Sequence, residues 1–64
     1  MKIILPDKSA RERSGVSIPV DTLLGELGLN PVEVMVARNG TLVPGDAIID
    51  EGDEVRIYRI THGG

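Results

Sequence analysis

The sequence predicts an α+β domain in which one short helix packs on one face of a β-sheet. Most apolar segments are short and alternate with period two, as strands do, whereas one segment repeats its apolar residues at helical spacing. The chain has 64 residues, a length that predicts one domain. Since the helix and the strands must share one core, we expect the helix to cover one sheet face and to leave the other open.

Two strands are predicted before the helix. Residues 1–5 form an apolar run that Pro6 closes, and residues 16–18 alternate until Pro19 ends them. The polar stretch between them, residues 7–15, is expected to be a loop that joins the two strands as a hairpin. It contains the densest basic segment of the chain, Lys8 to Arg13, for which we favour a solvated turn over a phosphate contact.

The helix is predicted over residues 20–27. Its apolar residues recur at i, i+3, i+4 and i+7 and so share one face: Val20, Leu23, Leu24 and Leu27. Pro19 suits the first turn, where a missing N–H costs little, and Gly28 suits a left-handed C-terminal cap.

Three more strands are predicted after the helix, and the last of them is the longest. Asn39-Gly40 is a strong signal for the turn between the first two. Residues 46–49 fit either a helical turn or an extended link, and residues 50–53 form an acidic turn. The predicted strands are residues 32–37, 41–43 and 54–60.

Strand alternation assigns side chains to the two faces of the sheet. The helix is expected to cover Ile3, Leu5, Val34, Val36, Val55 and Ile57. The opposite face then carries Met35, Ala37, Arg56, Tyr58 and Ile60. This apolar centre with a charged rim is either a scatter of exposed apolar residues or a surface that docks a partner.

The composition excludes several classes of function. The chain has no cysteine and only one histidine, His62, so a structural zinc site, an iron–sulfur cluster, a disulfide scaffold or thiol catalysis is not expected. A net charge of −3 and a single aromatic residue argue against nucleic acid as a partner. No apolar stretch reaches the length of a membrane span, and we expect a cytoplasmic protein with no catalytic residue and no metal site of its own.

The sequence ends in Gly63-Gly64, directly after the longest predicted strand. Glycines lack a Cβ, so this tail, residues 61–64, is expected to be flexible and to fit a narrow channel. Its reactive group is the Gly64 α-carboxylate, an anion at neutral pH and a poor electrophile until it is activated, for example by ATP. Because the chain has neither GxxxxGK[ST] nor GxGxxG, that activation must come from another protein.

Residues 50–64 resemble the C-terminal signature of the ubiquitin-like sulfur carriers, which include ThiS, MoaD and related archaeal ubiquitin-like modifiers. The shared features are an acidic Gly-Asp turn, an alternating last strand with an aromatic residue, and a terminal Gly-Gly. Residues 34–40, followed by Val43-Pro44, resemble the middle hairpin of that family. The resemblance implies a β-grasp fold, with a mixed sheet of four to five strands on one helix, as a single domain over residues 1–64.

The resemblance also implies a mechanism. A ubiquitin-activating-like adenylating enzyme would use ATP to convert the Gly64 carboxylate to an acyl-adenylate, and Gly63 would give the tail its reach. A sulfur donor, either a sulfurtransferase or a cysteine desulfurase, would then produce a C-terminal thiocarboxylate. An acceptor synthase would use that sulfur for thiamine, molybdopterin or a tRNA base. The residues expected to dock the activating enzyme are Met35, Arg56, Tyr58 and Ile60.

The sequence departs from the family pattern at two places and leaves two other functions open. His62 stands where thiazole carriers often have small or apolar residues, and residues 7–15 form a longer and more charged loop than the resemblance suggests. Joined to a lysine through Gly64, the chain would be a protein modifier instead of a sulfur carrier. It could also be a non-covalent β-grasp binding module whose Gly-Gly is incidental.

Overall fold

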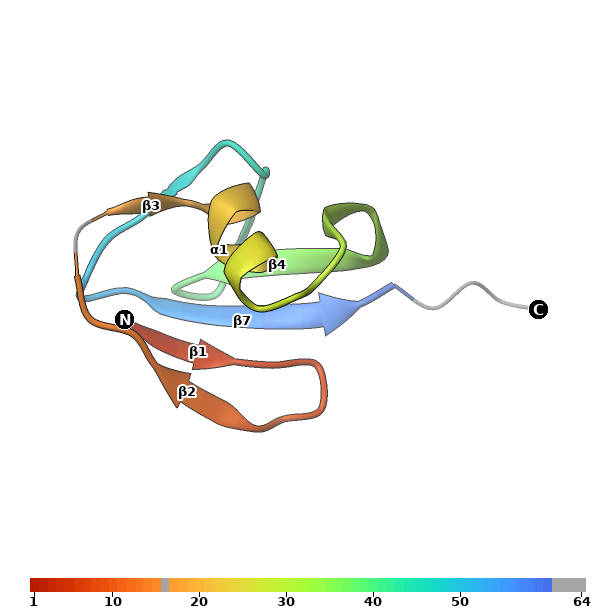
Figure 1. Cartoon of the computed structure of the whole chain (residues 1–64), viewed down its shortest axis with the longest axis horizontal. Helices are drawn as coiled ribbons and strands as arrows, with labels where there is room; N and C mark the ends of the chain where they lie inside the picture. The colour runs from red at the N-terminus through yellow and green to blue at the C-terminus, as the bar shows by residue number, and fades with distance from the viewer. Residues whose placement is uncertain (16, 61–64) are drawn as a thin grey trace.

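The computed structural model describes residues 1–15 and 17–60, which form a five-stranded mixed sheet with one α-helix on one face (Figure 1). The strand order is β2-β1-β7-β4-β5, with β1 and β7 parallel and the other neighbours antiparallel. The elements are β1 Lys2–Ile4, β2 Ala10–Glu12, β3 Ile18–Pro19, α1 Val20–Glu26, the 3-10 helix η1 Pro31–Glu33, β4 Val34–Arg38, β5 Thr41–Val43, β6 Ile48–Ile49 and β7 Glu54–Arg59.

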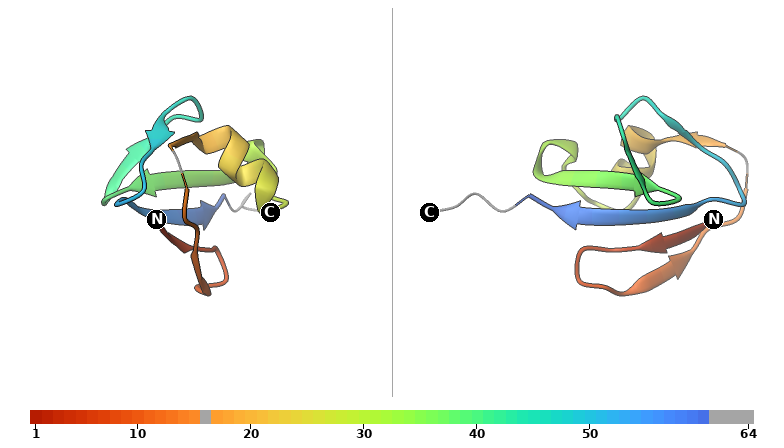
Figure 2. Two further views of the ribbon diagram at one scale, coloured as in Figure 1. Left: turned by 60° about the vertical axis from the view of Figure 1, so that its left-hand side comes forward. Right: turned by 180° about the vertical axis from the view of Figure 1, so that it is seen from behind.

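The helix lies on only one side of the sheet, as the other orientations in Figure 2 also show. The N-terminus and the end of β7 lie at opposite ends of the molecule (Figures 1 and 2). Within residues 1–15 and 17–60 no helix covers the second sheet face. The predicted α+β architecture, with a helix on one face and the other face open, is therefore confirmed.

The N-terminal hairpin is where the sequence prediction was wrong. The predicted loop over residues 7–15 contains β2, which pairs antiparallel with β1. All the residues of β2 are exposed, so no apolar alternation marks it as a strand. Arg11 and Glu12 place charges on this edge of the sheet, which discourages pairing with another chain.

The predicted strand over residues 16–18 is shifted and does not belong to the main sheet. Val16 lies outside the described residues, and β3 pairs with β6 in a separate two-stranded sheet. Residues 46–49 fitted either a helical turn or an extended link in the sequence. Their last two residues, β6, are extended. This pairing buries Ile18 and Ile49, which are 5% and 0% exposed.

The helix matches its prediction closely and differs at its ends. Leu27 is the C-cap and not the last helical residue, and Gly28 has the left-handed φ of 74° expected of it. Pro19 is extended and precedes the first turn. Two N–H groups at the start of the helix find carbonyl partners in the link before β6: Val20 donates to Ala47 and Asp21 to Gly45, both at 2.9 Å.

The strand predicted over residues 32–37 begins two residues later, at Val34. Residues 31–33 form η1, because the Asn30 side chain accepts a hydrogen bond from the Val32 N–H at 3.1 Å and so caps a helical turn. The turn at Asn39-Gly40 is confirmed, with positive φ at both residues, 51° and 88°.

The core agrees with the predicted set and is larger. The helix residues Val20, Leu23 and Leu24 are buried against β1, β4 and β7, whereas Leu5 and Leu27 are only partly buried at its margin. Additional core residues come from segments that the sequence analysis did not place in the core. The buried cluster comprises Met1, Ile3, Ile18, Val20, Leu23, Leu24, Val34, Val36, Ile49, Val55 and Ile57.

A network of side-chain hydrogen bonds ties the β4–β5 turn to the turn before β7. Asn39 Nδ2 donates to Asp53 Oδ1 at 2.9 Å, and the Glu54 N–H donates to Asn39 Oδ1 at 2.9 Å. The other Asp53 oxygen accepts the Asp50 N–H at 2.8 Å. The two bonds that Asp53 accepts, first the one from Asp50 and then the one from Asn39, lower the pKa of Asp53.

Asp53→Asn is expected to destabilise the domain at neutral pH by an amount that shrinks on acidification. A carboxyl whose pKa is lower in the folded state stabilises it above the ordinary pKa, and this contribution is lost as pH falls through the lowered value. Urea unfolding across that acidic range measures the effect. Asp46→Asn, at an exposed aspartate, is the control, and equal pH profiles for the two variants would contradict the prediction.

Candidate functional site

The sheet face away from the helix is the first candidate site, and we call it the outer face. Register places Met35 opposite Tyr58 and Ala37 opposite Arg56 across β4 and β7. It also places Leu42 opposite Ala37, and Ile4 opposite Arg56. With Ile60 just beyond the end of β7, the outer face comprises Ile4, Met35, Ala37, Leu42, Arg56, Tyr58 and Ile60.

The four predicted docking residues, Met35, Arg56, Tyr58 and Ile60, therefore lie on one face. Three of them are exposed apolar or aromatic side chains, at 42% for Met35, 45% for Tyr58 and 36% for Ile60. Ala37 shares their side of the sheet but is only 5% exposed, so the expectation that it adds to the accessible surface was wrong. Its small side chain lies in a shallow hollow that Gly40, Glu54, Arg56 and Tyr58 also line.

Leu42 is a residue of this face that the sequence analysis did not single out. It is 56% exposed and lies on the edge strand β5, beside Met35 and Ala37. The signal for it was present in the sequence, because the two-residue turn at Asn39-Gly40 fixes the register of the hairpin and hence the face of Leu42.

A groove of about 570 Å³ lies between the β1–β2 turn and the C-terminal half of β7. We call it the basic groove, since all its charged side chains are cationic: Lys8, Arg56 and Arg59. Apolar and aromatic residues form the rest of it. Its complete lining is Ile4, Leu5, Pro6, Lys8, Arg56, Ile57, Tyr58 and Arg59.

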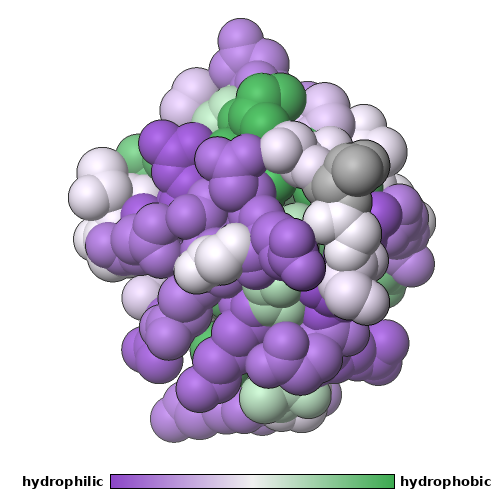
Figure 3. All heavy atoms as spheres, turned by 90° about the vertical axis from the view of Figure 1, so that its left-hand side faces the viewer, coloured by the Kyte–Doolittle hydropathy of each residue, from purple (hydrophilic) through white to green (hydrophobic). Residues whose placement is uncertain are grey.

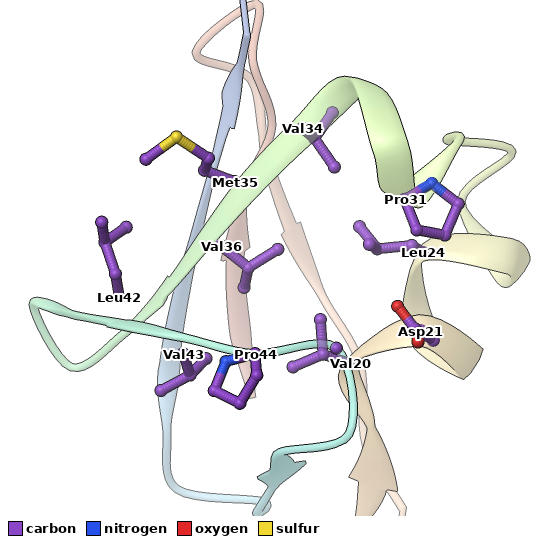
Figure 4. A pocket seen from close by; sticks show the side chains of 11 residues that line it. Val20, Asp21, Leu24, Pro31, Val34, Met35, Val36, Leu42, Val43 and Pro44 are labelled. Atoms are coloured by element: carbon purple, nitrogen blue, oxygen red, sulfur yellow. The ribbon is translucent and has the colours of Figure 1, made fainter.

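A second groove, of about 380 Å³, lies between α1 and the β4–β5 edge (Figure 4). Asp21 is its only charged lining residue, and its carboxylate lies beside Gly45, where the close-up shows it at the helix start. Apolar side chains of α1, β4 and β5 point toward this groove in Figure 4, among them Val20, Leu24 and Val36. The two grooves thus share an apolar character and carry opposite charges.

The end opposite the C-terminal end of β7 presents mostly hydrophilic residues, with few apolar ones among them (Figure 3). At the β7 end, Arg59 lies 3.8 Å from Glu33 in an exposed ion pair, and such pairs contribute little to stability. Among the described residues, Lys8 and Arg56 have no carboxylate within ion-pair distance.

The chain is held where it leaves the sheet. The Ile60 N–H donates to the Glu33 carbonyl at 2.8 Å, which fixes the last described residue against η1. The tail residues 61–64, with the predicted reactive residues Gly63 and Gly64 and the unassigned His62, lie outside the described residues. The described part contains no group of three metal-ligating side chains and no helix long and apolar enough to cross a membrane.

Comparison with known proteins identifies the family. The family model for small archaeal modifier protein 2 matches residues 15–61. The chain belongs to this family. No curated protein matches the sequence significantly. Among solved structures, the crystal structure of the thiamine biosynthesis protein ThiS from Geobacter metallireducens is similar over 100% of both chains, with 27% identity and a TM-score of 0.70.

These similarities confirm the family and the β-grasp fold that the sequence resemblance implied. The chain is a ubiquitin-like small modifier with the fold of ThiS-type sulfur carriers. The family match begins at residue 15 and so leaves out the N-terminal hairpin, the segment that departs most from the family pattern in the sequence. The basic groove is built partly from that hairpin.

Adjacent residues of β7 provide a direct test of the two faces. Ile57 is 2% exposed under the helix, so Ile57→Ala should cost about 2–5 kcal/mol in the free energy of unfolding. Tyr58 faces outward against Met35, so Tyr58→Ala should cost no more than about 1 kcal/mol. Urea unfolding of both variants measures the difference, and equal losses would mean that the faces are wrongly assigned.

Proposed function

We propose that this protein is a sulfur carrier whose Gly64 carboxylate is activated by a separate adenylating enzyme. The observation that supports this most is the position of the tail within a β-grasp fold of the ThiS type. Gly63-Gly64 follows closely after β7, and the Glu33 carbonyl holds that strand's exit beside an uncovered, apolar outer face. An enzyme bound to this face would find Ile60, four residues before Gly64, held in place by this bond.

The proposed reaction has two stages. A Gly64 carboxylate oxygen first attacks the α-phosphorus of ATP and pyrophosphate leaves, which makes the acyl carbon electrophilic. A persulfide then attacks that carbon, forming a C–S bond as AMP departs, and a thiol reduces the resulting S–S bond to release the thiocarboxylate. The chain contains no cysteine, so both the persulfide and the thiol must come from partner proteins or small molecules.

The outer face is the proposed docking surface for the activating enzyme, through Met35, Arg56, Tyr58 and Ile60. Aromatic, methionine and arginine side chains are enriched in the cores of protein interfaces. Leu42 extends this surface to the edge of the sheet. ATP would bind to the enzyme and not to this chain, and the further partners would be a cytoplasmic sulfur donor, either a sulfurtransferase or a cysteine desulfurase, and an acceptor synthase.

A second function is favoured by the family itself, which is described as a modifier. The neutral amine of a lysine side chain could attack the same activated Gly64 carbon. The product would be an isopeptide that joins the chain to a target protein, with AMP as the leaving group. The two functions share the activation step and differ in the nucleophile that follows it.

Intact mass spectrometry distinguishes the two. Incubated with an activating enzyme of the ubiquitin-activating type, ATP, a persulfide donor and a thiol, the chain should gain the mass of one sulfur in exchange for one oxygen. Modification would instead produce Gly64 linked to lysine in peptides of other proteins recovered from cells.

Deletion of Gly63 and Gly64 is the control, since it moves the C-terminal carboxylate back by two residues to His62 and leaves every described contact in place. Both products should disappear in that variant. If the intact chain shows neither product and the deletion variant supports growth as well as the intact chain does, the proposal is refuted and a non-covalent binding module is the better description.

A further inference from the structure

The basic groove brings together parts of the chain that are distant in sequence. Lys8 comes from the β1–β2 turn, and Arg56 and Arg59 come from β7. They line one groove because β1 pairs in parallel with β7, which sets Ile4 beside Arg56 and places the turn after β1 next to the last residues of β7. In a chain of net charge −3, three cations and no anion line this groove.

The turn that carries Lys8 is fixed by its own hydrogen bonds. The Leu5 N–H donates to the Ser9 carbonyl at 2.9 Å, and the Lys8 N–H donates to the Leu5 carbonyl at 2.8 Å. Asp7 accepts bonds from the Ser9 N–H at 2.9 Å and from the Ser9 hydroxyl at 2.6 Å. This geometry holds Lys8 at φ 72°, a left-handed conformation that is uncommon for residues other than glycine and occurs often at functional sites.

The cations of the groove are available to a ligand. Of the three groove cations, only Arg59 has an ion-pair partner among the described residues, Glu33 at 3.8 Å, and both of those side chains are more than half exposed. Lys8 and Arg56 have no ion-pair partner among the described residues, so solvent and salt balance their charges. A bound carboxylate would form charge-assisted hydrogen bonds with guanidinium groups.

The floor of the groove is apolar. Ile4, Leu5 and Pro6 are partly exposed along one side, and the ring of Tyr58, 45% exposed, lies on the other. Such a floor gains free energy by covering an apolar side chain. A ligand that fills the groove would therefore have an apolar part and an anionic part close together.

We propose that the basic groove binds a protein segment in which an acidic side chain lies next to an apolar one. The proposal rests on the proposed function, because it assigns this segment to the enzyme that activates the C-terminus. The groove shares Arg56 and Tyr58 with the docking surface and lies beside the exit of the tail. It adds the N-terminal hairpin to that surface and gives the partner an acidic contact.

A protein segment fits the groove better than nucleic acid does. Binding of single strands uses several stacking aromatics along a basic track, and this chain has one aromatic residue and three clustered cations in the groove. A peptide carboxylate needs only a local cluster of positive charge.

The first test uses a peptide of alternating leucine and glutamate, and the same peptide with glutamine in place of glutamate, titrated into the full chain with amide NMR detection. The glutamate peptide should shift the amides of Lys8, Tyr58 and Arg59 and should bind more tightly. Lys8→Gln and Arg56→Gln should each weaken it by about two- to fivefold, the effect typical of an exposed ion pair. Lys2→Gln is the matched control, because Lys2 lies on β1 outside the groove.

Three results would overturn the proposal: equal affinity for the two peptides, no groove shifts at millimolar peptide, or equal losses for Lys8→Gln and Lys2→Gln. The proposal would also be wrong if a single-stranded oligonucleotide of the same charge bound the groove more tightly than the glutamate peptide, because the ligand would then be a phosphate backbone and not a protein segment.

The second test separates the groove from the proposed function. With the activating enzyme, Lys8→Gln should raise the KM for the chain at unchanged kcat for adenylate formation, and an unchanged KM would show that this enzyme does not use the groove. Deletion of Gly63 and Gly64 should leave peptide binding intact. If mass spectrometry detects no thiocarboxylate but the peptide still binds, the groove proposal is supported and the proposed carrier function is refuted.

Discussion

Burial of one side of β7 is the constraint on which the rest of this structure depends. Val55 and Ile57 lie under the helix and are 0% and 2% exposed, so alternation sends Arg56 and Tyr58 to the opposite face. The same strand pairs with β1 on one side and β4 on the other, and both neighbours take their register from it. A slip by one residue would expose the core and bury an arginine, so the outer face is as strongly determined as the core.

The parts of the fold that the sequence predicted well are those with strong local signals. The helix has its apolar stripe and its glycine cap, the β4–β5 turn has Asn39-Gly40, and β7 has a long alternation. β2 has none of these, because it is exposed on both faces and is specified only by its pairing with β1. β6 was ambiguous for a similar reason: it has two residues, and its partner β3 is distant in sequence.

The candidate site divides in the same way. Met35, Arg56, Tyr58 and Ile60 were assigned to one face from alternation within single strands, and the register brings them together. Alternation within single strands could not predict the basic groove. Residues 8 and 56–59 are far apart in the sequence, and only the parallel pairing of β1 with β7 makes them neighbours. From the sequence alone, the basic segment around Lys8 therefore predicts only a solvated turn.

The parallel pairing of β1 with β7 also has a mechanical consequence. The first strand begins at one end of the molecule and the last strand leaves at the other, so tension applied between the two termini runs along both strands in opposite directions (Figure 1). The hydrogen bonds between them lie across that direction and must fail together, in shear, instead of opening one at a time. A protein pulled by its tail into the channel of another would resist extension at this ladder before its core was exposed.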